Sequence, residues 1–282
     1  MSTEHGVLFV VATPIGNLDD MTFRAVDVLR GCGCIVAEDT RRTRQLLTHF
    51  GINGKRLERL DAHATEHAVG RVVDWLTKGE AIAVVTDAGT PSVSDPGDEL
   101  VRAAIAAGVR VVPIPGPSAV LTALSASGLA GGGHFRFLGF LPRDGTARRD
   151  ALAGVADTAE AVVLFEAPGR MRATLRDLAD ATPDRRVCVA RELTKVHEEF
   201  VHGSCAEVAA NEREWLGEAA IVLGAHAPDA RSSRIDDVAL DERIDEALGR
   251  GERARTVAER LSAWSGRRKH DVYERVIARK SR

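Results

Sequence analysis

The chain has 282 residues, of which 44% are hydrophobic, and a formal net charge of −3. Its length and apolar content predict two globular domains or one large one, and its small net charge excludes a strong general attraction to polyanions. The charge is unevenly spread, however, because residues 252–282 hold ten Lys and Arg against four Asp and Glu, which leaves +6 there and −9 elsewhere. A basic tail on an acidic body indicates either a polyanionic partner at one end or simply the solvated face of a helix.

The first apolar run, residues 7–12, follows no basic segment and is too short for a signal peptide or a membrane span. The cysteines at 32, 34, 188 and 205 match no zinc or redox spacing. We therefore expect reduced, packed cysteines, no metal, no membrane contact and a cytoplasmic location.

The first part of the chain repeats a strand, a polar loop and a helix four times. Apolar runs predict strands at 7–12, 34–37, 81–85 and 109–114. Helical spacing or helix-end signals follow at 22–29, 42–50, 69–76, 98–105 and 119–127. This order predicts a largely parallel sheet, with the loops TPIGN, AEDTRR, TDAGTPSVSDPG and PGPSA on the edge where α/β sheets bind ligands. Neither a dinucleotide fingerprint nor a Walker loop occurs.

Glycines at 128 and 131–133 predict a domain boundary, so we expect one α/β domain over 1–127 and a second over 128–228. In the second domain we expect strands at 135–140, 161–165 and 186–190, and a helix at 171–179. Two further extended segments, 198–203 and 219–224, are expected to form hairpins in the sheet.

Residues 225–236 lack periodicity and are expected to be a linker. Three short helices are expected beyond it, within a basic extension over 237–282. A glycine-containing turn near residue 266 separates the last two, which is typical of a helix-turn-helix-like unit.

The strand-end segments occur in one order together with PIPGPSAVLTALSASGL, FLGFLPR, FEAPGR and RELTKVHEEF. Together they resemble the bacterial small-subunit (16S) ribosomal RNA cytidine 2′-O-methyltransferase I family, within the tetrapyrrole methylase-like superfamily. The matching motifs span residues 8 to about 224, and the basic tail is similar to the helical extension of these proteins.

The resemblance implies a two-domain α/β enzyme with a cleft between its domains and S-adenosyl-L-methionine as methyl donor. It implies 2′-O-methylation of a cytidine ribose in the decoding region of small-subunit ribosomal RNA, within the assembled 30S subunit, by a homodimer. Two other functions stay open: a small-molecule methylase acting on a tetrapyrrole, and a nucleic-acid-binding regulator without catalysis. The charged loops AEDTRR and RELTK argue against a flat, apolar substrate.

The resemblance places the cofactor against residues from four segments, and Asp87 is close enough in sequence to join them: Pro14, Ile15, Asp87, Gly89, Thr90, Val93, Ser118, Ala119 and Phe165. The apolar members suit an adenine ring, and the polar members suit its edges. The superfamily motif has two glycines before Asp-Pro, whereas this chain has Ala88-Gly89-Thr90-Pro91, so no carboxylate role transfers to position 90.

Methyl transfer needs alignment of donor and acceptor and removal of the hydroxyl proton. Our catalytic candidates are Glu38, Asp39, Glu192 and Lys195. A lysine acts as a base only where burial or nearby cations lower its pKa. The alternatives are that Glu38 or Asp39 caps the next helix and that Lys195 forms an exposed ion pair.

Candidate RNA contacts are arginines and a lysine in the loops and the tail, because guanidinium groups bind phosphate in a fork. They are Arg41, Arg42, Arg170, Arg267, Arg268 and Lys269.

Overall fold

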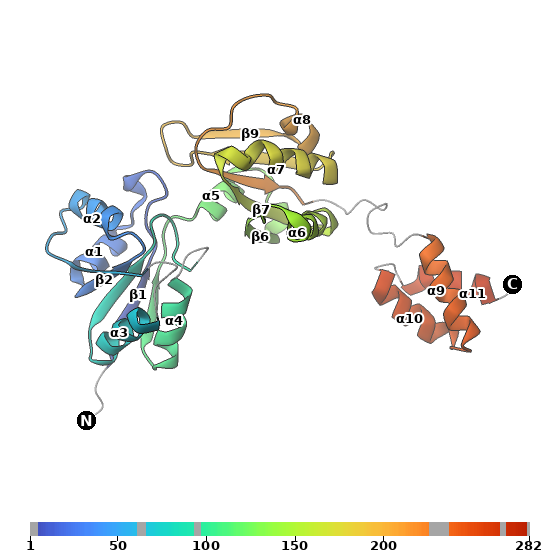
Figure 1. Cartoon of the computed structure of the whole chain (residues 1–282), viewed down its shortest axis with the longest axis horizontal. Helices are drawn as coiled ribbons and strands as arrows, with labels where there is room; N and C mark the ends of the chain where they lie inside the picture. Colours follow the sequence, from blue (N-terminus) through green and yellow to red (C-terminus); the bar gives the residue numbers. More distant parts are fainter. Residues whose placement is uncertain (1–4, 61–65, 93–96, 226–236, 266–268, 281–282) are drawn as a thin grey trace.

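A computed structural model describes residues 5–60, 66–92, 97–225, 237–265 and 269–280. These residues form two five-stranded sheets and a group of three C-terminal helices (Figure 1). The described helices include none that is long and apolar enough to cross a membrane.

The first sheet has the strand order β3-β2-β4-β1-β5, and all its described pairs are parallel, as the sequence predicts. Its strands are β1 (Val7–Val11), β2 (Cys34–Ala37), β3 (Arg56–Arg59), β4 (Ala81–Val85) and β5 (Arg110–Ile114). The edge strand β3 was not predicted, because Arg-Leu-Glu-Arg has no apolar run. The central strands are apolar on both faces because helices cover both.

Those covering helices are α1 (Phe23–Gly31), α2 (Thr40–His49), α3 (Glu66–Thr77) and α4 (Gly97–Ala106). One face packs against α1 and α2 through side chains such as Leu29 and Leu47. The other packs against α3 and α4 through Val72 and Leu100. A short 3-10 helix, η1 (Leu18–Asp20), follows the loop after β1.

The second sheet is mixed, with the order β6-β7-β10-β8-β9. Its strands are β6 (Phe135–Phe140), β7 (Ala161–Glu166), β8 (Arg186–Arg191), β9 (Glu199–Ser204) and β10 (Ala219–Leu223). Strand β10 runs antiparallel to both β7 and β8, and β8 forms a hairpin with β9. The two segments expected to make hairpins therefore lie on opposite sides of β8 and do not pair with each other.

Helices also cover the second sheet on both faces: α5 (Ala119–Ala126), α6 (Gly145–Asp157), α7 (Pro168–Ala181) and α8 (Cys205–Ala209). The first of these, α5, follows a strand of the first sheet, yet its Val120, Ala123 and Leu124 belong to the core of the second. The chain thus crosses between sheets near Pro115–Ser118, and we propose this crossing as the boundary in place of residue 127. The glycine-rich turn η2 (Gly131–Gly133) lies after the crossing.

The C-terminal helices are α9 (Asp237–Gly249), α10 (Ala254–Ser265) and α11 (Lys269–Lys280). They share a core that includes Leu240, Ile244, Val257, Leu261 and Val276, and Figure 1 shows them beyond the two sheets. Arg275 pairs with Asp241 at 2.6 Å, which joins α11 to α9. The predicted three-helix unit is confirmed.

Candidate active site

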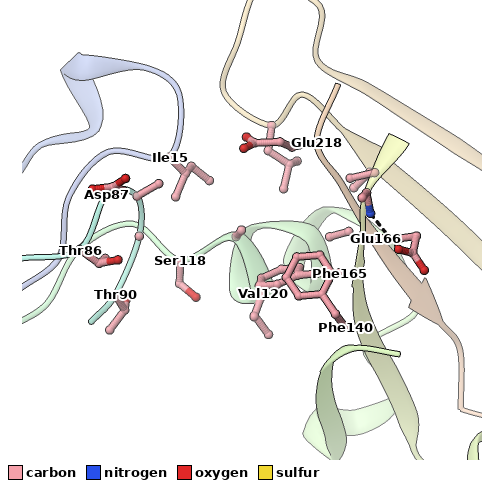
Figure 2. A pocket seen from close by; sticks show the side chains of 18 of the residues that line it. Ile15, Thr86, Asp87, Thr90, Ser118, Val120, Phe140, Phe165, Glu166 and Glu218 are labelled. Atoms are coloured by element: carbon pink, nitrogen blue, oxygen red, sulfur yellow. Dashed lines mark hydrogen bonds between the residues drawn. The ribbon is translucent and has the colours of Figure 1, made fainter. Parts of the chain in front are cut away.

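A cavity of about 610 Å³ lies where the strand-end loops of the two sheets face each other. The first sheet contributes loops after β2, β4 and β5 together with Ile15 after β1, and the second contributes the end of β7, the start of β10 and the segment after β8. Figure 2 shows Asp87 and Thr90 on one side, Phe165 and Glu166 on the other, and Ser118 between them. Parallel strands gather their carboxyl ends at one edge, and β10 runs the opposite way, so its first residues reach the same edge.

The structure brings most of the predicted cofactor residues to this cavity. Seven of them line it: Ile15, Asp87, Gly89, Thr90, Ser118, Ala119 and Phe165. Pro14 lines an adjoining hollow, and Val93 lies outside the described residues.

Hydrogen bonds between backbones hold the loops after β1 and β4 together. The amide of Thr13 donates to the carbonyl of Gly89 at 2.9 Å, and the Gly89 amide donates back at 3.0 Å. Gly89 has φ of +84°, a conformation that glycine adopts at little cost. The Thr90 hydroxyl donates to the carbonyl of Pro117 at 3.1 Å, which ties this pair of loops to the loop after β5.

An aromatic wall closes the cavity on the side of the second sheet. Phe165 stacks edge-on against Phe137, with ring centroids 4.9 Å apart. The ring centroid of Phe140 lies 5.7 Å from that of Phe165. Between this wall and the loop after β4, Ser118 caps the N-terminus of α5 with its side chain. The cavity therefore offers an apolar face for a ring and polar groups for its edges.

A buried ion pair fixes the loop after β7. The side chain of Glu166 is fully buried and accepts hydrogen bonds from the Ala167 amide at 2.9 Å and from the Thr174 hydroxyl at 2.6 Å. Arg170 pairs with the same carboxylate at 3.1 Å and donates to the carbonyl of Leu141 at 2.6 Å. The guanidinium of Arg170 thus holds two loop ends together, and its predicted contact with RNA phosphate stays a prediction.

A lysine between two carboxylates borders the cavity. The ammonium group of Lys195 lies 2.9 Å from Glu192 and 3.0 Å from Glu218, and the Glu218 amide donates to Glu192 at 2.9 Å. Partial burial acts against the charge of Lys195, but the two carboxylates raise its pKa above the ordinary lysine value. A raised pKa favours the ammonium form of Lys195, whereas a base needs a lowered pKa, so the predicted role of Lys195 as a base stays a prediction.

The loop that carries this lysine is strained and meets the first sheet's loop directly. Glu192 and Thr194 have φ of +50° and +64°, which non-glycine residues rarely adopt. The Asn17 amide donates to the hydroxyl of Thr194 at 2.9 Å. A Cβ on Gly16 would lie 2.6 Å from Cγ of Lys195, so only glycine allows this approach.

Asp39 acts structurally at the start of α2. Its carboxylate caps the helix by accepting from the Arg41 amide, and it pairs with the Arg41 guanidinium at 2.9 Å. These contacts hold the pKa of Asp39 well below its usual range. The Asp39 amide in turn donates to Asp87 at 3.1 Å, and Asp87 pairs with Arg42 at 3.2 Å.

Of the four catalytic candidates, Glu38 and Lys195 line the cavity, whereas Asp39 and Glu192 support residues that do. Among the RNA candidates, Arg42 lines the cavity, Lys269 pairs with Glu259 at 2.7 Å, and Arg267 and Arg268 lie outside the described residues.

Sequence reasoning missed Glu218, Glu166 and Phe140, which also line the cavity. Glu218 directly precedes an apolar run, but its place at this edge depends on the antiparallel direction of β10.

Comparisons with known proteins identify the class. Residues 7–209 match the family model of Tetrapyrrole (Corrin/Porphyrin) Methylases, and the chain belongs to this family of S-adenosylmethionine-dependent methyltransferases. Among solved structures, uroporphyrin-III C-methyl transferase from Thermus thermophilus, complexed with S-adenyl homocysteine, shares the fold at a TM-score of 0.55 and 19% identity. That match covers 78% of this chain and 97% of the other.

Proteins with higher sequence identity to this chain are named for one activity. A protein of Xylella fastidiosa named ribosomal RNA small subunit methyltransferase I is 49% identical, over 79% of this chain and 82% of its own length. A Halalkalibacterium halodurans protein of the same name is 39% identical over 96% of this chain and 94% of its own. The expected fold, family and enzyme class are thereby confirmed.

Proposed function

We propose that this protein transfers a methyl group from S-adenosylmethionine to the ribose 2′-hydroxyl of a cytidine in small-subunit ribosomal RNA. The observation that carries the proposal is the similarity to relatives named for this ribosomal subunit, over nearly the whole chain including the C-terminal helices. A cavity built from the loops of both sheets supports it.

The residues of the cavity fit the methyl donor. Gly89 and Ile15 approach closely, since a Cβ on Gly89 would lie 3.4 Å from Cγ2 of Ile15, so a larger residue at position 89 would narrow the space for the donor. Phe165 offers a face to adenine, and Asp87 and Thr90 offer acceptors to polar edges. The lining holds more carboxylates than cations, which suits a positively charged sulfonium.

S-adenosylmethionine supplies an electrophilic methyl group when bound. The protein's task is then to align the acceptor hydroxyl and accept its proton. We propose Glu38 as the carboxylate that faces this hydroxyl, because it lines the cavity, whereas Asp39 is committed to the helix cap. Lys195 holds Glu192 and Glu218 in place and keeps a positive charge near the phosphates of the acceptor strand.

We further propose that the substrate is the assembled 30S subunit, that the C-terminal helices contact its RNA, and that the protein acts in the cytoplasm. The +6 charge of residues 252–282 supports a contact with RNA, while the −9 of the remainder disfavours tight binding of free RNA by the body. We also propose a homodimer, which would cover exposed apolar side chains such as Phe23 and Val196.

Labelled methyl transfer to purified small subunits tests the activity. We expect incorporation into the RNA of 30S subunits, with far less into free small-subunit RNA and none into a tetrapyrrole. Methylation of the tetrapyrrole alone would support the small-molecule alternative. Tight binding of RNA without binding of S-adenosylmethionine in calorimetry would support a regulator instead.

A further inference from the structure

A second hollow, of about 460 Å³, adjoins the main cavity on the side of helix α2. Pro14, Leu18, Gln45 and Leu46 line this hollow and not the main cavity. Ile15, Asp87, Lys195 and Glu218 line both, so the two spaces meet at these side chains. We propose that this second hollow is the subsite for the acceptor nucleotide; the inference rests on the proposed function and assigns a place to its RNA substrate.

The composition of the hollow suits a nucleotide. Pro14, Leu18 and Leu46 supply apolar surface for the faces of a base, and the Gln45 amide supplies a donor and an acceptor for its edge. Its volume falls in the range of small-molecule binding sites. Gln45 is exposed on α2 and lines the hollow, so its amide is within reach of a ligand there.

The two spaces differ in the charged side chains that line them. The main cavity is lined by the carboxylates Glu38, Asp87 and Glu218 and by the cations Arg42 and Lys195, while the carboxylate of Glu166 is buried and paired with Arg170. The second hollow balances Asp87 and Glu218 against Arg42 and Lys195, and it borders a helix, Thr40–His49, that carries three arginines and no acid. Asp87, Glu218, Arg42 and Lys195 line both spaces, so the difference in charge comes from Glu38, which lines the main cavity alone and favours the sulfonium there. At the junction, Arg42 offers its guanidinium to a phosphodiester.

The shared boundary is where a methyl group would pass from donor to acceptor. Ile15 and Asp87 come from the first sheet, and Lys195 and Glu218 come from the second. The contact of Gly16 with Lys195 fixes these two sides against each other. The acceptor hydroxyl therefore reaches the methyl donor across the junction of the two sheets. The nucleobase of the acceptor is then held in the second hollow, beside α2.

A large side chain placed in the second hollow tests whether the acceptor nucleotide binds there. Gln45→Trp fills the second hollow without touching the main cavity, and Thr48→Trp places the same bulk on an exposed site of the same helix that lines neither space. We expect Gln45→Trp to lower kcat/KM for 30S subunits at least tenfold, with S-adenosylmethionine affinity within twofold of the wild type. Thr48→Trp should leave both unchanged.

Leu18→Trp enters the hollow from η1 instead and guards against a folding defect in the helix. Equal loss of kcat/KM in both plugged variants, with unchanged donor binding, supports the subsite. Wild-type turnover in either folded variant would overturn it, even though the proposed function would stand. A wild-type protein that binds S-adenosylmethionine but methylates no 30S subunit would overturn the proposed function, and the subsite with it.

Discussion

At the scale of single residues, the cavity depends on side chains held by their neighbours. Phe165 is fixed by two other phenylalanines, and Lys195 is fixed by two carboxylates. Phe165 was predicted from the family resemblance, and Lys195 from the charged segment RELTK. The sequence could not predict that Lys195 would be held as a cation, because Glu218 lies 23 positions away in the chain.

Replacing Phe165 by Ala should weaken binding of S-adenosylmethionine roughly tenfold, about 1.4 kcal/mol, because the adenine face loses its apolar wall. Isothermal calorimetry measures this affinity, and thermal unfolding checks that the protein stays folded. Ile105→Ala is the control, since Ile105 is 61% exposed and lines neither cavity. Equal affinities in the two variants would remove Phe165 from the donor site.

The ion pair of Glu192 should make stability depend on pH. Lys195 lowers the pKa of Glu192 below the ordinary value of 4.5, so the stabilisation exists above that value and disappears as the pH falls through the lowered pKa. Glu192→Gln should therefore cost about 0.5–1 kcal/mol at pH 7 and less below pH 4.5. Urea unfolding at both pH values measures the difference, and a cost that is constant with pH would contradict the ion pair.

At the scale of elements, the strand-end loops carry the site, and the strands position them. Apolar runs predicted β1, β2, β4 and β5, because strands of a parallel sheet covered by helices are mostly apolar, although the edge strand β5 exposes Arg110. Helix α6 and strand β3 escaped prediction. The first has a weak pattern of polar and apolar residues, and the second is a polar edge strand. Pairing partners were also out of reach, because the hydrophobic pattern does not state which strands become neighbours.

Gly16 should be needed for the contact between the loops after β1 and β8. A Cβ there would lie 2.6 Å from Cγ of Lys195 and 2.9 Å from the Leu193 carbonyl, so Gly16→Ala forces the loops apart. We expect a loss of about 1–3 kcal/mol in the free energy of unfolding and a clear fall in methyl transfer.

Gly70→Ala is the matched control, because Gly70 lies within α3 and a Cβ there meets nothing within 4 Å. It should be neutral or stabilising by up to about 1 kcal/mol. Chemical denaturation and turnover, measured on both variants, separate the outcomes. Equal behaviour of the two alanines would show that the approach of the two loops is unimportant.

Across the whole molecule, the described cores fall into three parts of the chain: each sheet has a core on both of its faces, and the C-terminal helices share one of their own. The order of these parts was predictable from composition and motifs. The packing of α5 against the second sheet was not predictable, because its apolar side chains would suit either sheet.

Removing residues 237–282 should leave both sheets intact, because the described core of α9–α11 is formed by those helices alone. We expect weaker binding to 30S subunits, a smaller dependence on salt, and unchanged affinity for S-adenosylmethionine. Filter binding over a range of salt concentrations measures the first two, and calorimetry the third. Unchanged RNA affinity would exclude the extension as an RNA contact.

The most direct test of the central claim is mass mapping of ribose methylation on small-subunit RNA, after incubation of 30S subunits with this protein and S-adenosylmethionine. We expect one added methyl group on the ribose of a cytidine in the decoding region. A methyl group on a base, or no methyl group on the RNA at all, would contradict it.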